Sequence, residues 1–240
     1  MRGRACDVRG HGPAELLSYA PMNPLAVLGL GLLLGLRHAA DPDHVVAVTT
    51  IAARTRRVLP ATLLGLAWGL GHTLTLMVVA GAIIAFNWAV PPRLGLAMEF
   101  GVALALIVIG LVNLRHPPHP ATDLEQSPGR PPAGRAFLVG LVHGLAGSAA
   151  VALLVVATVR DPALAGGYLL LFSLGTLVGM VLITTGFAVP VVTAAERWGG
   201  AGRWIRMSTG ALSLGFGAWL VIQIGWVDGL FRTVAHWAPK

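Results

Sequence analysis

Long apolar blocks, separated by short polar connections, run through the chain from residue 22 to its C-terminal region. We expect helices at roughly 24–53, 60–86, 94–114, 136–159, 165–195 and 206–230. Each block approaches or exceeds the ~18 to 20 apolar residues that a helix needs to cross a bilayer. The pattern therefore predicts an all-α polytopic membrane protein with about six transmembrane helices.

One polar connection, at residues 115–135, is much longer than the others and rich in proline, glycine and charge. It is typical of a flexible linker, and it divides the chain into a first transmembrane half at 22–114 and a second at 136–231. Residues 1–21 form a polar tail without the apolar core of a signal peptide. Because Met22 directly precedes the first block, translation can start at Met1 or at Met22, and the second choice leaves the tail untranslated.

The composition agrees with a membrane protein, since 55% of residues are hydrophobic, 11% are charged and the mean hydropathy is +0.75. In a soluble protein a net charge of +7 would suggest a nucleic-acid partner, but here the arginines lie between apolar blocks. We therefore expect the lipid bilayer as partner and no nucleic acid. The single cysteine, Cys6, excludes an internal disulfide framework and a thiolate-rich metal site.

Arginines are distributed unequally between the connections. Connections one, three and five carry Arg54, Arg56, Arg57, Arg115, Arg130, Arg135, Arg197, Arg203 and Arg206, whereas connections two and four carry only Arg93 and Arg160. Loops rich in Lys and Arg stay in the cytoplasm. The pattern predicts a multi-pass protein of the cell inner membrane with the odd-numbered loops cytoplasmic and both termini outside.

The first block contains the stretch GLRHAADPDHVVAV, which places five ionisable side chains within eight residues: Arg37, His38, Asp41, Asp43 and His44. The flanking segments 24–36 and 45–53 are each too short to span a membrane, but joined they form one crossing with the charges near its middle. A solvated loop between two hairpin helices is the alternative. Because intramembrane charges are costly and usually functional, we favour the single crossing.

Pro42 should interrupt the helix of this first span. Proline has no backbone N–H, so the carbonyl of His38 loses its helical partner. Either the helix kinks, or it stops and restarts with Asp41 as N-cap and Pro42 at the first helical position. Both geometries bring the aspartates close to carbonyls without intrahelical partners.

The side chains of this stretch suit a transition metal. Imidazole and carboxylate without sulfur favour a borderline divalent ion such as Ni²⁺ or Co²⁺, although Zn²⁺ and Cu²⁺ also accept imidazole. Aspartates would offset the charge of the cation in a medium of low dielectric constant. Arg37 is expected to pair with Asp41 or Asp43, which would keep the carboxylates charged when no metal is bound.

Two histidines elsewhere in the apolar blocks are further candidates. His72, in WGLGHTLTL, can be a structural hydrogen-bonding group or part of the site. His143, in GLVHGLAGSAAVAL, occupies the position of His38 when the two halves are aligned, and can act as a ligand, a gate or a proton relay. His116 and His119, in the linker, are expected to be solvated.

The two halves resemble each other in sequence. Gly35–Val48 aligns with Gly140–Leu153, and GLGHTLTL at 69–76 aligns with SLGTLVGM at 173–180. Because three spans per repeat is an odd number, the second half would be inserted upside down relative to the first. This predicts two inverted three-helix repeats with a site near the membrane midplane, a common plan among secondary transporters.

The motif RHAADPDH also resembles the His-x4-Asp-His signature of the nickel/cobalt transporter family, and GLGHTLTL resembles that family's second conserved segment. The likeness extends over residues 30–80, and the short chain with its HGLAGSAA segment is similar to the compact UreH-like branch. The resemblance implies metal binding by His38, Asp43 and His44, supported by Asp41 and His72. It also implies a cytoplasmic nickel chaperone or the maturation factors of urease or hydrogenase as partners.

We therefore expect a secondary permease, not an enzyme, that imports nickel or cobalt as its cargo and needs no cofactor. No GxxxxGK[ST] loop for a built-in ATP motor occurs in the sequence. One alternative is efflux of a metal or of a small anion such as sulfite, with Arg37 facing the anion. A more remote alternative is an intramembrane metalloenzyme, for which the sequence offers no HExxH motif.

Overall fold

The computed structural model describes residues 23–55, 57–86, 90–115, 133–145, 159, 161–198 and 200–237. Its helices are α1 (Pro24–His38), α2 (Pro42–Ala52), α3 (Val58–Phe86), α4 (Pro92–Arg115), α6 (Pro162–Arg197), α7 (Ala201–Ile222) and the π-helix η1 (Gln223–Val227). A shorter apolar helix covers Ala133–Leu145. The described part of the chain contains no strand, which confirms the all-helical class.

Four helices are long and apolar enough to cross a membrane: α3, α4, α6 and α7 continued by η1. Helices α1 and α2 meet the same criterion only when taken together, as a broken span or a re-entrant loop bent by 53°. Of the expected fourth span, the structure describes Ala133–Leu145, while 146–158 lie outside the described residues. The same holds for the N-terminal tail and for most of the expected linker.

The break at Pro42 takes the second of the two expected geometries, because the helix stops and restarts. Helix α1 ends at His38, and α2 begins at Pro42 with an extended Asp41 (φ −61°, ψ 145°) as its N-cap residue. The first span begins in a similar way, since the Asn23 side chain accepts a hydrogen bond from the backbone N–H of Leu25 and Pro24 follows it.

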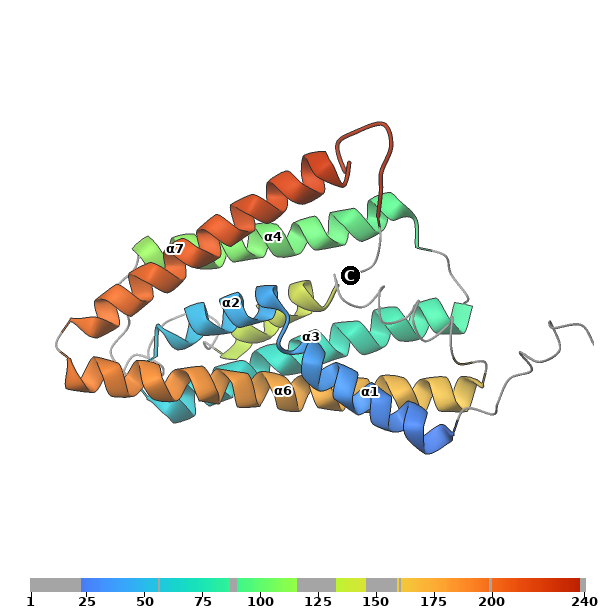
Figure 1. The fold of residues 1–240 in the computed structure, drawn as a ribbon, viewed down its shortest axis with the longest axis horizontal. Helices are drawn as coiled ribbons and strands as arrows, with labels where there is room; N and C mark the ends of the chain where they lie inside the picture. Colours follow the sequence, from blue (N-terminus) through green and yellow to red (C-terminus); the bar gives the residue numbers. More distant parts are fainter. Residues whose placement is uncertain are drawn as a thin grey trace, which may run out of the picture.

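The helices are arranged so that the ends next to the basic connections lie together (Figure 1). Helix α1 packs against α6, α3 also runs along α6, and α7 packs along α4. The C-terminal ends of α2, α4 and α6 and the N-terminal ends of α3 and α7 are at the same end of the molecule. The break between α1 and α2 lies near the middle of the bundle, so α1 runs from one end to the break and α2 continues from it toward the other end.

Glycines allow the backbones of the two halves to approach closely. A methyl group added at Gly35 of α1 would lie against the carbonyl oxygen of Phe172 in α6, and one added at Gly140 would lie against that of Trp68 in α3. Such contacts need residues without a side chain and hold the helices at short interaxial distance. They position the end of α1 and the helix Ala133–Leu145 against the two long helices.

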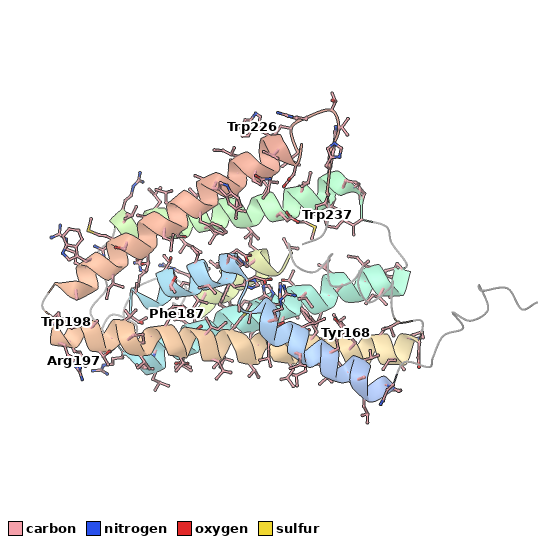
Figure 2. All side chains as sticks on the ribbon, viewed as in Figure 1. Tyr168, Phe187, Arg197, Trp198, Trp226 and Trp237 are labelled. Atoms are coloured by element: carbon pink, nitrogen blue, oxygen red, sulfur yellow. The ribbon has the colours of Figure 1, made fainter. Side chains whose placement is uncertain are left out.

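Aromatic and basic residues mark the ends of the long helices. Figure 2 shows Arg197 and Trp198 together at the C-terminal end of α6, whereas Trp226 lies near the far end of α7. The side chains of Trp198 and Trp226 are exposed. Tryptophan is enriched at the interfaces of a bilayer with water, so these positions agree with a transmembrane orientation of α6 and α7.

Arg206 differs from its expected place in a loop, because α7 begins at Ala201 and includes it. Its buried guanidinium donates to the backbone carbonyl of Asn113 in α4. Partial burial, together with the nearby charges of Arg206 and Arg135, lowers the pKa of the Arg54 guanidinium. Arg206 and Arg135 therefore lie near Arg54 at one end of the bundle, where their charges repel that of Arg54.

The close crossing at Gly35 leads to a prediction about stability. In Gly35→Ala the new methyl group meets backbone atoms of Phe172 and Thr176, which cannot rotate away. We expect a loss of about 1–3 kcal/mol from overpacking and a lower thermal unfolding midpoint in detergent. Gly29→Ala is the matched control on α1, since nothing lies within 4 Å of a methyl group there. Equal midpoints for the two variants would contradict the close packing.

Candidate metal centre

Four histidines from four helices meet where the first span breaks. His38 is the last residue of α1, His44 lies in the first turn of α2, His72 is in the middle of α3, and His143 is near the end of Ala133–Leu145. The ring centroid of His44 lies 4.7 Å from that of His38 and 4.8 Å from those of His72 and His143. His44 is therefore the centre of the cluster.

The imidazole of His38 is oriented by the N-cap residue of the next helix. Its Nδ1–H donates to Oδ2 of Asp41 over 2.8 Å. Asp41 makes no side-chain capping bond to α2, so its carboxylate is available for this role. Because the proton is held on Nδ1, the Nε2 atom of His38 presents a lone pair. Carboxylates orient the histidines of known metal sites in the same way.

The imidazole of His44 is oriented by the carbonyl that Pro42 leaves without a helical partner. The His38 carbonyl accepts hydrogen bonds from the backbone N–H of Asp41 at 3.1 Å and from Nδ1–H of His44 at 2.7 Å. His44 must therefore carry its proton on Nδ1, and its Nε2 atom presents the lone pair. The helix break thus positions two imidazoles at once.

His72 completes a group of three imidazoles. Its Nε2 atom lies 3.3 Å from Nε2 of His38, and ligand atoms of His38, His44 and His72 all lie within 4.8 Å of one another. Bonds of about 2.0–2.1 Å from a metal to nitrogen place neighbouring ligand nitrogens about 3.0–3.4 Å apart. The spacing between His38 and His72 fits that geometry.

A second group shares His44 with the first. Nε2–H of His143 donates to Oδ2 of Asp43 over 2.9 Å, and ligand atoms of Asp43, His44 and His143 also lie within 4.8 Å of one another. The two groups bring together His38, Asp43, His44, His72 and His143, while Asp41 reaches the first group only through its hydrogen bond with His38. All of these residues come from the first half of the chain except His143, which comes from the second.

Comparisons with known proteins agree with this site. Residues 25–115 match the family model NicO, described as "High-affinity nickel-transport protein". The chain is also 32% identical over 223 residues to the urease accessory protein UreH of Bacillus sp. (strain TB-90), covering 87% of this chain and 96% of that protein. No solved structure matches the chain.

The chain belongs to the NicO family of nickel transporters. It is a membrane protein that imports nickel or cobalt, and the metal is its substrate rather than a cofactor. The expectation of a transporter instead of an intramembrane metalloenzyme is confirmed by this membership. The matched segment 25–115 contains His38, Asp43, His44 and His72 but ends before His143.

In this NicO protein the clustered histidines are largely shielded from solvent. His44, His72 and His143 have exposed fractions of 1%, 0% and 1%, whereas the side chains of Asp41 and Asp43 are 43% and 28% exposed. The carboxylates therefore lie nearer the surface of the bundle than the imidazoles do. Burying ionisable side chains inside a membrane protein is energetically unfavourable, and such residues usually have a function.

Two aromatic side chains form walls of the centre, and sequence reasoning assigned no such role to them. Trp68 lies 5.4 Å, centroid to centroid, from His143, and Phe172 lies 5.4 Å from His38. Both residues precede by three positions the glycines that align between the halves, Gly71 and Gly175. This shared spacing is the feature of the sequence from which the equivalent positions of Trp68 and Phe172 could have been predicted.

The position of Arg37 differs from expectation. Its side chain is exposed, and the ion-pair partners of Asp41 and Asp43 within the described residues are His38 and His143. Histidine thus takes the place that we expected arginine to fill. His116 and His119 lie outside the described residues.

Proposed function

We propose that this NicO protein binds its metal at the break between α1 and α2, through Nε2 of His38 and His44, with His72 as third imidazole and Asp43 beside them. The observation that carries the proposal is the 2.7 Å hydrogen bond from His44 to the His38 carbonyl, which aims His44 into the cluster. A second support is the burial of the imidazole groups, and a third is their spacing.

The chemistry of these groups suits a cation that must leave water. Imidazole nitrogens replace water molecules around Ni²⁺ or Co²⁺, and the charges of Asp41 and Asp43 offset that of the ion in a medium of low dielectric constant. Because the histidines bind metal only in their neutral form, loading competes with protonation. The absence of sulfur from the cluster within the described residues disfavours Cu⁺.

We also propose that the fold consists of six spans in two inverted repeats. The glycine contacts support this, because they are paired between the halves: the contact of Gly35 with Phe172 corresponds to that of Gly140 with Trp68.

A second pair of contacts follows the same relation. A methyl group added at Gly71 would meet Phe137, and one added at Gly175 would meet Leu32. Phe137 and Leu32 each lie three residues before the aligned glycines Gly140 and Gly35. The equal 5.4 Å distances of His38 to Phe172 and of His143 to Trp68 follow the same relation.

We infer that the end of the bundle with Arg54, Arg115 and Arg197 faces the cytoplasm, that both termini lie outside, and that the protein resides in the cell inner membrane. The excess of arginine at this end supports the assignment. Metal released there would be available to a nickel chaperone or to urease maturation factors. The printed name of the relative, a urease accessory protein, favours the second.

Loss of a ligand should abolish transport. In cells without their own nickel importer, His38→Ala and Asp43→Asn should each reduce radiolabelled Ni²⁺ uptake by about 10-fold or more, since each removes a group from the site. His236→Ala is the matched control, because His236 is exposed and lies near the C-terminus, away from the cluster. Near-normal uptake by His38→Ala and Asp43→Asn at normal membrane levels would overturn the proposed site.

The orientation is testable with single cysteines in a Cys6→Ser background, which has no other thiol. Glu196→Cys, near the arginine-rich end of α6, should react with a membrane-impermeant maleimide only after the cells are opened. Thr233→Cys, near the opposite end, should react in intact cells. Both residues are exposed, so accessibility to solvent is matched. The reverse labelling pattern would show that the orientation is inverted.

A further inference from the structure

The metal centre contains two overlapping groups of ligands, and their overlap has a consequence for transport. The groups are His38–His44–His72, which we call the first position, and Asp43–His44–His143, which we call the second position. His44 is their common member. This inference rests on the proposed function of the site and adds a second metal position to it.

His44 can serve only one position at a time. Its Nδ1–H is bound to the carbonyl of His38, so Nε2 is its one available lone pair. Its ring lies 4.7 Å from that of His38 and 4.8 Å from that of His143. A metal on Nε2 of His44 can therefore bind at the first or the second position, and the two positions exclude each other.

Two of the remaining ligands, His38 and His143, reach the centre on short helices from opposite ends of the molecule. His38 ends α1, which begins at Pro24, whereas His143 lies near the end of Ala133–Leu145, which begins at the end marked by Arg135. Replacing His38 by His143 in the coordination sphere transfers the metal from one half-helix to the other. The transfer requires movement of a few ångströms, with His44 attached throughout.

Both positions are held by an internal hydrogen bond when they contain no metal. Nε2–H of His143 donates to Asp43, so both atoms are engaged with each other. Nδ1 of His143 is buried and has no hydrogen-bond partner, so the imidazole can receive its proton there when Nε2 is needed for metal. The first position is arranged in the same way: the His38 proton is on Nδ1, so Nε2 of His38 accepts a hydrogen bond from Nε2–H of His72 over 3.3 Å. Nδ1 of His72 is also buried without a partner and can receive the proton when Nε2 is needed for metal.

We propose that the metal is passed from His38 and His72 to Asp43 and His143 around a fixed His44, one ion per molecule, as the step that carries it between the two halves of the chain. His143 is then a ligand of the second position rather than a structural contact of Asp43.

The first test separates binding from transport. His143→Gln keeps an N–H that can donate to Asp43 but removes the imidazole ligand. The purified variant should still bind one Ni²⁺ per chain by equilibrium dialysis, while uptake in cells falls by about 10-fold or more. Unchanged uptake, loss of binding, or two Ni²⁺ bound simultaneously by the wild type would overturn the two-position scheme. Failure of the wild type to bind Ni²⁺ at all would instead overturn the proposed function.

The second test asks whether residue 143 touches the metal. In the Cys6→Ser background, His143→Cys loaded with Co²⁺ should show a thiolate-to-cobalt charge-transfer band in the near ultraviolet, because a thiolate attracts the ion to the second position. Val142→Cys is the matched control, since its side chain is 41% exposed and lies on the adjacent residue. A His143→Cys protein that binds Co²⁺ as its parent does, but without the band, would overturn the proposal.

Discussion

The hydrogen bond from Nδ1–H of His44 to the carbonyl of His38 is the interaction on which the centre depends. It exists because Pro42 has no N–H to offer that carbonyl, so the helix stops and the oxygen becomes free to accept a side chain. The same break releases Asp41 from helical geometry, and its carboxylate then orients His38. One missing donor in the backbone thus positions the lone pairs of the two histidines that we propose as metal ligands.

A break of this kind inside an apolar bundle must be buried in protein or line a water-filled cavity, because unpaired backbone groups are costly in lipid. The close glycine crossings bury its histidines, while Asp41 and Asp43 stay partly exposed. Gly35 and Gly140 let α1 and Ala133–Leu145 contact the backbones of α6 and α3, and Phe172 and Trp68 then form the walls of the cluster. Packing and chemistry are linked, since the residues that set the helix spacing also surround the histidines.

Much of this arrangement could be predicted from the sequence, because local rules determine it. The lengths of the apolar blocks gave the bounds of α3 to within a few residues, and Pro42 indicated the break. The alignment of the halves pointed to His143. Sequence patterns could not reveal that histidines, rather than Arg37, pair with the aspartates, nor that Arg206 is buried against Asn113. Those contacts join segments distant in the chain and depend on how the helices pack.

X-ray absorption at the nickel edge of the purified, Ni²⁺-loaded protein tests the central claim most directly, because it reports the atoms bound to the metal. The account predicts a first shell of nitrogen and oxygen with the multiple-scattering features of at least two imidazoles, which His44→Ala reduces. A shell of water oxygens alone, or a spectrum that His44→Ala leaves unchanged, would contradict it.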